Sequence, residues 1–287
     1  MQAPVLFALL LLCAGWYWTG SRRLRLRLAG QRRRPSASPR AIAFYSALAS
    51  IALALAGPVD ELSDELLWAH MLQHLLLMAV AAPLLVLGAP WLPFWRPLPL
   101  GFRRRVASAV VQGPRLGWLR AMARFLSLPT VAWVLFNGDL AFWHVPAVYD
   151  LTLRNTAVHY VEHLSLLAFG MLFWAQSFES PPFHPRLGHF QRVAFLTAGA
   201  TAAWLLAVVL ALSPSPLYPA YVSIHPRPEG LSALTDQQLA AGAMWGPGSV
   251  PYALGVFWLL YAWLEEDGGR RRRPHRRRRL APSRESR

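Results

Sequence analysis

Long apolar stretches, separated by short polar or arginine-rich connections, follow one another along almost the whole chain. Each stretch approaches the roughly 20 residues that an α-helix needs to cross a bilayer. The pattern predicts an all-α fold, a polytopic membrane bundle of seven transmembrane helices. The expected spans are residues 4–18, 41–57, 67–88, 128–143, 158–178, 193–212 and 238–264.

Prolines inside two of these stretches predict local departures from a straight helix. Pro83 lies in the third expected span, and Pro247 and Pro251 lie in the seventh. A proline within a transmembrane helix removes a backbone donor, so the helix there is kinked or locally open. Gly246 and Gly248 flank Pro247, which makes the seventh span the one most expected to bend.

Composition agrees with a membrane protein and predicts one domain followed by a tail. Of the 287 residues, 55% are hydrophobic and only 15% are charged. Residues 1–267 are expected to form the seven-helix transmembrane domain. Residues 268–287 are rich in arginine, and like charges at this density repel one another, so we expect a disordered tail there.

The arginines are placed unevenly, and their placement predicts the orientation of the chain. They fill the connections after the first, third, fifth and seventh stretches, in residues 22–40, 96–124, 186–192 and 270–287. The positive-inside rule then puts the N-terminus outside and the C-terminal tail in the cytoplasm. The net charge of +15 does not indicate nucleic-acid binding, because the tail lacks the aromatic residues that such binding uses. The expected partner of these arginines is the lipid bilayer.

Two histidine pairs stand near the beginning of apolar stretches, in His70-Met-Leu-Gln-His74 and His159-Tyr-Val-Glu162-His163. Side chains four residues apart share one face of a helix, so each pair can direct two imidazoles to one point. Ionisable groups are costly in lipid and usually carry function there. A single buried histidine is more often a hydrogen-bonded core residue, but two pairs at matched depth favour a metal site.

The predicted orientation brings further polar residues to the same depth, just below the outer surface. Asp139 and His144 fall near the outer end of the fourth span, and Asp236 and Met244 near the outer end of the seventh. We therefore expect His70, His74, His159 and His163 as metal ligands, with His144, Asp139 and Met244 as auxiliary ligands. Glu162 is either a ligand or, like Asp236, a partner that orients an imidazole or carries a proton.

The expected ligands are nitrogen and carboxylate donors, which suit copper, zinc or iron. Thioether sulfur from methionine would favour Cu(I), although Met71 and Met78 are most simply explained by apolar packing. Cys13 is the chain's single cysteine, so a thiolate metal site is not expected.

Three other functions remain open at this point, and one of them is a purely structural scaffold whose histidines only form hydrogen bonds. His159-x-x-Glu162-His163 matches the H-x-x-E-H motif of inverted zinc proteases, but the motif is short and leaves the other histidine pair unused. A haem held by two histidines between the third and fifth spans is the stronger alternative, as a membrane electron carrier or haem-handling protein, since helical bundles bind haem between facing helices.

Three segments of the chain resemble the CtaG family of cytochrome c oxidase assembly factors, the seven-span type found in bacteria. The segments are His70-Met-Leu-Gln-His74 with Pro83-Leu-Leu and Gly88-Ala-Pro90; Trp143-His144-x-Pro146-x-x-Tyr149-Asp150-x-x-Leu153-Arg154-Asn155-x-x-x-His159-x-x-Glu162-His163 with Phe173-Trp174; and Leu231-Ser-Ala-Leu-x-Asp236-Gln237-Gln238-Leu239-Ala240 with Met244-Trp245-x-Pro247-Gly248. The resemblance covers roughly residues 42–264.

The resemblance implies a non-enzymatic role in the maturation of haem–copper cytochrome c oxidase, in the inner or plasma membrane of a bacterium. It implies copper as the metal, handed to the oxidase at the outer face of the membrane. The expected partners are oxidase subunits and periplasmic copper chaperones.

Overall fold

The structure is a computed structural model that describes residues 3–28, 38–224 and 230–279, and the side chains of residues 3–26, 38–224 and 230–267. Every regular element in these ranges is helical, and the only strand-like feature among them is an isolated bridge between Ser180 and Phe183. The all-α prediction is therefore confirmed. The side chains of the arginine-rich tail expected at residues 268–287 all lie outside the described part of the chain, as does the backbone of residues 280–287; the backbone of residues 268–279 continues helix α14.

Sixteen elements follow one another along the described chain. They are α1 (Ala3–Leu28), α2 (Pro39–Ala56), α3 (Pro58–Ser63), α4 (Leu67–Leu75), the π-helical turn η1 (Leu76–Ala81), α5 (Ala82–Gly88), α6 (Trp91–Trp95), α7 (Leu100–Gln112), the 3-10 turn η2 (Pro114–Leu116), α8 (Gly117–Leu126), α9 (Pro129–Trp143), α10 (Pro146–Arg154), α11 (Thr156–Trp174), α12 (His189–Leu212), α13 (Pro219–Val222) and α14 (Ala233–Arg279).

Each of the seven apolar stretches coincides with a long helix or with part of one. Five helical segments of the described chain are long and apolar enough to cross a membrane, and a sixth results if α8 and α9, which meet at 75°, count as one bent span. The five are Ala3–Leu26, Pro39–Ala56, Leu67–Gly88, Thr156–Trp174 and His189–Leu212. The chain thus has the helices of a multi-pass membrane protein.

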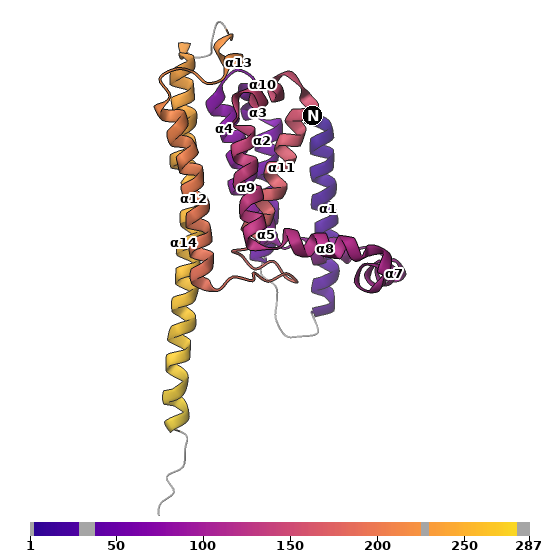
Figure 1. The fold of residues 1–287 in the computed structure, drawn as a ribbon. Coiled ribbons are helices and arrows are strands. Elements are labelled where there is room, and N and C mark those ends of the chain that lie inside the picture. The colour runs from indigo at the N-terminus through magenta and orange to yellow at the C-terminus, as the bar shows by residue number, and fades with distance from the viewer. Residues whose placement is uncertain (1–2, 29–37, 225–229, 280–287) are drawn as a thin grey trace, which may run out of the picture.

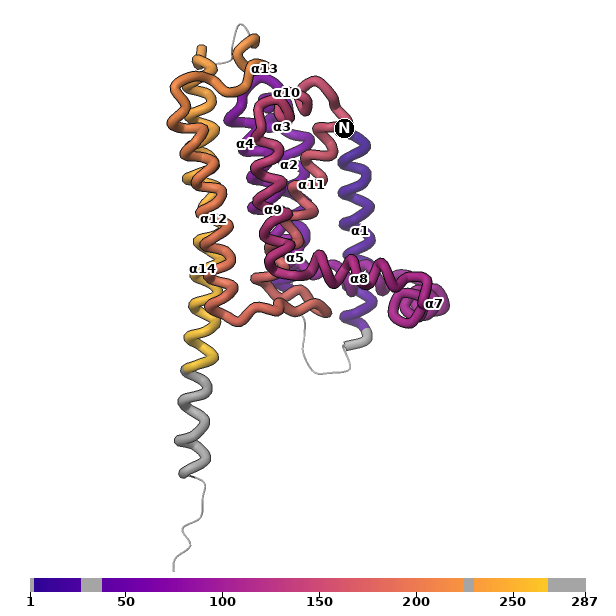
Figure 2. The backbone as a smooth tube through the Cα atoms, viewed as in Figure 1, coloured from indigo at the N-terminus to yellow at the C-terminus, as the bar shows by residue number. Residues whose placement is uncertain are grey.

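The long helices lie roughly parallel (Figure 1), with α2, α4, α5, α9 and α11 grouped together. The pair α12 and α14 runs along one side of this group, and α1 along the other; Figure 2 shows α12 and α14 next to each other over much of their length. The short helices α3, α10 and α13 cover one end, the end at which the N-terminus lies. At the other end, α7 and α8 project sideways as an arm.

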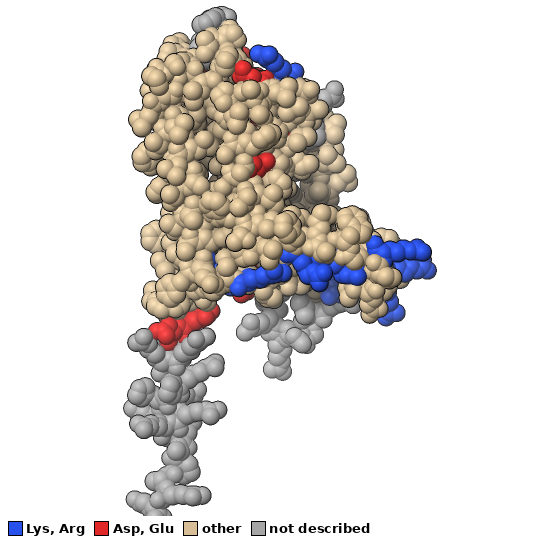
Figure 3. Space-filling view, in the orientation of Figure 1, with Lys and Arg blue, Asp and Glu red and all other residues tan. Residues whose placement is uncertain are grey.

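The outer faces of the long helices expose large apolar side chains. Leu12 in α1, Leu212 in α12 and Phe257 in α14 are 69%, 78% and 69% exposed. Exposing so much apolar surface to water would be unfavourable, whereas contact with lipid tails is not. Arginines gather instead on the projecting arm, as the blue surface in Figure 3 shows.

Close packing in the centre depends on small residues where α11 crosses the segment around η1. A Cβ atom added at Gly170 would lie 3.0 Å from Ala82 Cβ and 3.3 Å from the carbonyl oxygen of Met78. Small residues let transmembrane helices approach closely and gain van der Waals contact. This approach holds α11 against the helix that follows the first histidine pair.

The π-helical turn η1 lies directly after the first histidine pair, and Pro83 accounts for it. Proline has no N–H, so it cannot make the usual bond to a carbonyl four residues back. The helix widens by one residue before the proline, and the Ala82 amide donates to the carbonyl of Leu77. The local opening expected at Pro83 is confirmed.

Side chains from two neighbouring helices bind carbonyls of the widened turn. The Ser50 hydroxyl donates to the carbonyl of Leu76 at 2.9 Å, and the Trp174 indole donates to the carbonyl of Met78 at 2.9 Å. Such partners are needed because unpaired backbone groups are costly inside a membrane. The opening is therefore stabilised by α2 and α11.

A bend is expected at Pro247 and Pro251, but the helix is not broken there. Helix α14 runs as one element from Ala233 to Arg279 and includes both prolines. It lies against α12 through this region. Packing along a neighbouring helix offsets the loss of two backbone bonds, and this tertiary support is absent from the local sequence pattern.

Candidate metal centre

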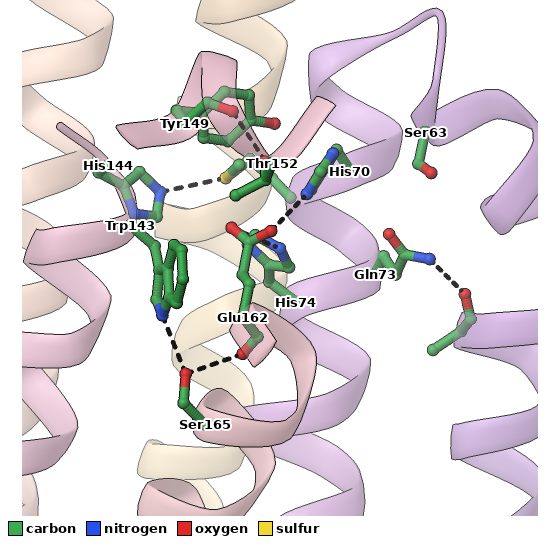
Figure 4. A network of polar contacts seen from close by, with 12 residues as sticks. Ser63, His70, Gln73, His74, Trp143, His144, Tyr149, Thr152, Glu162 and Ser165 are labelled. Atoms are coloured by element: carbon green, nitrogen blue, oxygen red, sulfur yellow. Dashed lines mark hydrogen bonds and ion pairs between the residues drawn. The ribbon is translucent and has the colours of Figure 1, made fainter. Parts of the chain in front are cut away.

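The two histidine pairs face each other from α4 and α11. Ligand atoms of His70, His159, Glu162 and His163 all lie within 4.8 Å of one another. His74 joins the group through its Nε2 atom, 3.4 Å from Glu162 Oε1 (Figure 4). We call these five residues the His/Glu cluster.

Glu162 lies between the imidazoles, and its two oxygens face different histidines. Its Oε2 atom is 3.7 Å from His70 Nε2, while Oε1 faces His74. The side chain is completely buried. A buried carboxylate is costly unless it is paired with positive charge, hydrogen-bonded or bound to a metal.

The polar atoms of the cluster lack the hydrogen bonds that buried groups normally make. No partner among the described residues bonds the following buried atoms: His70 Nε2, both nitrogens of His74, His159 Nε2, both oxygens of Glu162 and His163 Nε2. Leaving each such atom unpaired costs about 1–3 kcal/mol. Ligand atoms of His70, His159, Glu162 and His163 lie close to one another, and a bound metal ion would satisfy such a group.

The spacing is close to that of a coordination shell. Ligand nitrogens and carboxylate oxygens bind zinc at about 2.0–2.2 Å, so the donor atoms around one ion are separated by at most about 4 Å. The donors of His70, His159, Glu162 and His163 span up to 4.8 Å. Small side-chain rotations would bring them onto one ion.

Tyr221 fixes the orientation of the first imidazole from outside the cluster. Its hydroxyl donates to the carbonyl of Ser63 at 2.7 Å and lies 3.2 Å from His70 Nδ1. The hydroxyl proton is used on Ser63, so His70 Nδ1 must carry a proton and donate it. The lone pair of His70 then lies on Nε2, directed at Glu162. Burial raises the pKa of Tyr221, which keeps the phenol protonated.

Helix α4 is held in place by contacts that are distant in sequence. Asp236 of α14 accepts hydrogen bonds from the amides of Leu67 and Trp68, at 2.9 and 3.0 Å, where α4 begins. Helix N-termini have unsatisfied amides, and a carboxylate there stabilises them. Asp236 thus positions the helix that carries His70 and His74.

The side chain of Gln73 binds the last turn of α4 to neighbouring helices. Its amide donates to the carbonyl of Ala54 in α2 and to Asp60 Oδ1 in α3, both at 2.8 Å. Gln73 is completely buried and lies between the two histidines along the chain. These bonds restrict rotation of α4 about its axis, which would turn the histidine pair away from α11.

The second histidine pair is placed by the way α11 begins. Asn155 is the N-cap, and its side-chain oxygen accepts from the amides of Ala157 and Val158 at 3.0 and 3.3 Å. An asparagine in this position stabilises a helix beginning. Because the cap fixes the first turn, it also fixes the position of His159.

Asp139 and His144 lie near the cluster but contact other residues. Asp139 accepts hydrogen bonds from the Trp143 indole at 2.9 Å and the Ser165 hydroxyl at 3.1 Å. His144 lies with its Nδ1 atom 2.7 Å from the carbonyl of Leu140 and its Nε2 atom 3.2 Å from Met71 Sδ. Neither residue belongs to the set of ligand atoms within 4.8 Å.

Met244 of α14 lies beside the cluster rather than in it. Together with Met71, His74 and His144 it lines a cavity of about 20 Å³. We call this space the thioether cavity. Of the nine residues expected to form the site, the structure brings His70, His74, His159, Glu162 and His163 together, and it places Asp139, His144, Asp236 and Met244 around them.

Several residues that support the cluster are not identifiable from the sequence. Tyr221 lies 151 positions from His70, and Gln73 is 19 positions from Ala54. No local pattern marks such contacts. Gln73 stands between two histidines in an apolar stretch, so its cost of burial in lipid is the one signal that could have identified it.

Comparison with known proteins gives three mycobacterial relatives. Uncharacterized proteins of Mycobacterium bovis and Mycobacterium tuberculosis are each 26% identical to the chain over 243 residues. One of Mycobacterium leprae is 23% identical over 234 residues. These matches cover 83%, 83% and 79% of this chain but only 36%, 36% and 34% of the relatives, so the chain spans about a third of their length. No solved structure matches.

The family comparison covers nearly the whole described bundle. The family described as cytochrome c oxidase caa3 assembly factor (Caa3_CtaG) matches residues 15–266, which include the His/Glu cluster and all the helices that surround it. The chain therefore belongs to the Caa3_CtaG family of cytochrome c oxidase assembly factors.

Proposed function

We propose that this protein binds a copper ion at the His/Glu cluster and delivers it to a haem–copper cytochrome c oxidase during assembly. One observation carries the proposal: buried donor atoms from α4 and α11 converge within 4.8 Å and have no hydrogen-bond partners among the described residues. Membership of an oxidase assembly family supplies the process. Copper is the cargo of the protein, and assembly requires no catalytic step.

We further propose seven membrane spans, with α14 as the seventh, an external N-terminus and a cytoplasmic C-terminus. The N-terminus lies at the same end as the short helices α3, α10 and α13, and the arginines of α7 and α8 lie at the opposite end (Figures 1 and 3). This separation agrees with the positive-inside rule. The His/Glu cluster then lies close to the outer face of the inner or plasma membrane of a bacterium.

A bare ion fits the packing of the cluster better than haem does. Ring centroids of His70 and His159 are 5.1 Å apart, those of His74 and His163 are 5.6 Å apart, and Glu162 lies among them. A macrocycle would have to replace this carboxylate, and the neighbouring cavity of about 20 Å³ holds only a single small ligand. Zinc shares the donor chemistry, so the oxidase context is what favours copper.

Delivery requires that the ion can leave. Metal ligands must be deprotonated to bind, so protonation of imidazoles and of Glu162 would release copper. We propose that oxidase subunits accept the ion at the outer face and that a periplasmic copper chaperone supplies it. Apolar faces of α1, α12 and α14 contact lipid, and no nucleic-acid partner is proposed.

Two measurements test the proposal. The first is elemental analysis and a visible spectrum of the full chain purified from membranes. We expect bound copper and no haem absorption bands, and a His70→Ala/His163→Ala variant should hold less copper than wild type. A matched His184→Ala variant, changed in an exposed loop outside the cluster, should retain it. Equal copper contents in wild type and double variant would show that the cluster does not bind the copper. Haem absorption bands would show that the protein binds haem in place of copper.

The second measurement is genetic. In a bacterium that lacks its own copy, wild type and His184→Ala should restore cytochrome c oxidase activity. The double variant, expressed at the same level in the membrane, should not. Full restoration by the double variant would show that assembly does not use the cluster.

A further inference from the structure

His144 and Met71 form a contact that hydrogen bonding does not explain. His144 Nδ1 lies 2.7 Å from the carbonyl of Leu140, which can only accept, so Nδ1 carries the proton. The Nε2 lone pair therefore faces Met71 Sδ at 3.2 Å. A thioether has no proton to donate. Two lone-pair donors, one nitrogen and one sulfur, thus point at each other inside the protein.

Both residues line the thioether cavity, and further donors lie on its wall. His144 and Met71 are 6% and 1% exposed, and Met78 and Met244 contribute two more thioether side chains to the lining. The cavity has a volume of about 20 Å³. A space of about 10–15 Å³ or more is enough for one water-sized occupant, so the cavity fits a single ion.

The donor set differs in kind from that of the His/Glu cluster. Thioether sulfur with one imidazole is a soft set, which selects Cu(I), whereas imidazoles with a carboxylate also accept harder divalent ions. The cavity is formed by residues from α4, η1, α12, α14 and the end of α9. Copper held there would be in its reduced state.

His74 belongs both to the thioether cavity and to the His/Glu cluster. It lines the thioether cavity, and its Nε2 atom is 3.4 Å from Glu162 in the His/Glu cluster. Its ring centroid lies 6.5 Å from that of His144 and 5.6 Å from that of His163. Both of its nitrogens are buried without a hydrogen-bond partner among the described residues. A rotation of this one ring would carry an ion from one donor set to the other.

We propose that Met71, His144 and Met244 form a second metal site, selective for monovalent copper, and that His74 links it to the His/Glu cluster. The link rests on the proposed copper role of the cluster, whereas the second site rests on its own donors. The pair of sites would let the protein accept copper at one and release it from the other without exposing the ion to water.

The test uses the full chain in detergent micelles under anaerobic, reducing conditions. Cu(I) is titrated in competition with a chromophoric chelator, and X-ray absorption at the copper edge then reports sulfur neighbours. We expect wild type to bind two equivalents, with sulfur at about 2.3 Å, the length of a typical metal–sulfur bond. Met71→Leu/Met244→Leu should bind one equivalent and lose the sulfur signal. Met171→Leu, which removes a thioether outside the cavity, should behave as wild type.

Leucine preserves the volume of methionine, so the variants should fold, and thermal unfolding of each checks this. If the double variant does not fold, Met244→Leu alone should weaken the sulfur signal. Two equivalents and unchanged sulfur in the folded double variant would overturn the second site. So would wild type that binds copper without sulfur neighbours, leaving the cavity to water.

The same experiment separates this inference from the proposed function. His70→Ala/His163→Ala should keep one equivalent of copper with sulfur neighbours, which would support the second site. Wild type with one equivalent, bound through nitrogen and oxygen only and lost in that variant, would overturn the second site and leave the cluster standing. A single equivalent with sulfur neighbours, bound equally by wild type and that variant, would instead overturn the cluster.

Discussion

The hydroxyl of Tyr221 lies 3.2 Å from Nδ1 of His70 and holds that imidazole with its other nitrogen toward Glu162. The same hydroxyl donates to the carbonyl of Ser63. One phenol therefore decides which nitrogen of a candidate ligand is free to bind a metal, and it does so from α13, outside the predicted spans.

Replacing Tyr221 by phenylalanine should weaken metal binding without removing a ligand. Partners that orient a metal-binding histidine are worth about 10- to 100-fold in affinity, so we expect a loss in this range. Competition titration with a copper chelator measures it. Tyr160→Phe is the matched control, since Tyr160 is 43% exposed on α11. Equal affinities in the two variants would show that the Tyr221 hydroxyl does not orient His70.

Replacing Glu162 by glutamine tests whether the carboxylate takes part in binding. Glutamine has nearly the same shape but no negative charge. We expect copper affinity to fall by at least the roughly 10-fold that loss of a supporting partner causes, and by more if the carboxylate binds the ion. Glu179→Gln removes a charge from an exposed position and should leave affinity unchanged. A Glu162→Gln protein with wild-type affinity would assign binding to the histidines alone.

Replacing Asp236 by alanine should loosen the beginning of α4. The carboxylate accepts from the amides of Leu67 and Trp68, and loss of a capping side chain costs about 0.5–2 kcal/mol. Thermal unfolding in micelles should report a lower midpoint, with a smaller decrease for Asp236→Asn, which keeps one acceptor oxygen. An unchanged midpoint in Asp236→Ala would mean that packing alone holds α4.

Asp60 should make stability depend on pH. Burial raises the pKa of Asp60 above its ordinary value of 3.8, against the opposing effect of the hydrogen bond from Gln73. The folded protein then holds this proton to higher pH than the unfolded chain does. Its contribution to stability is therefore complete below the ordinary pKa and declines as pH rises from there through the raised value.

Asp60→Asn cannot ionise but keeps an oxygen for the amide of Gln73. As pH rises above about 4, the ordinary pKa of an aspartate, we expect the unfolding midpoint temperature of this variant to fall less than that of wild type. Midpoints measured in the same micelles at a series of pH values give the two slopes. Identical slopes would show that Asp60 does not contribute to the pH dependence.

The helices and the grouping of the four histidines could be predicted from the sequence, because both follow from local patterns. Apolar stretches mark the helices, and His70, His74, His159 and His163 lie four apart on helix faces, so two helices in contact suffice to bring them together. The same reasoning expected Asp139 among the ligands from its depth alone. The structure shows Asp139 bonded to Trp143 and Ser165, and these contacts could not be predicted because depth does not determine which way a side chain points.

What the sequence could not supply are relationships between distant segments. The contact of Asp236 with the amides that begin α4 joins positions 169 and 168 residues apart. The contact of His144 with Met71 joins positions 73 residues apart. Both depend on how α4 packs against α14 and the end of α9, and this packing is decided by the whole bundle.

The widened turn η1 determines how the two ends of the helical segment Leu67–Gly88 are rotated relative to each other. Asp236 fixes this helix at one end, and Gly170 packs against it at the other. A regular α-helix turns by about 100° per residue, so if the turn closed to an α-helix while keeping all its residues, one end would rotate relative to the other by about that angle. Either the histidine pair or the contact with α11 would then face the wrong way. The widened turn thus keeps the candidate ligands in phase with the body of the bundle.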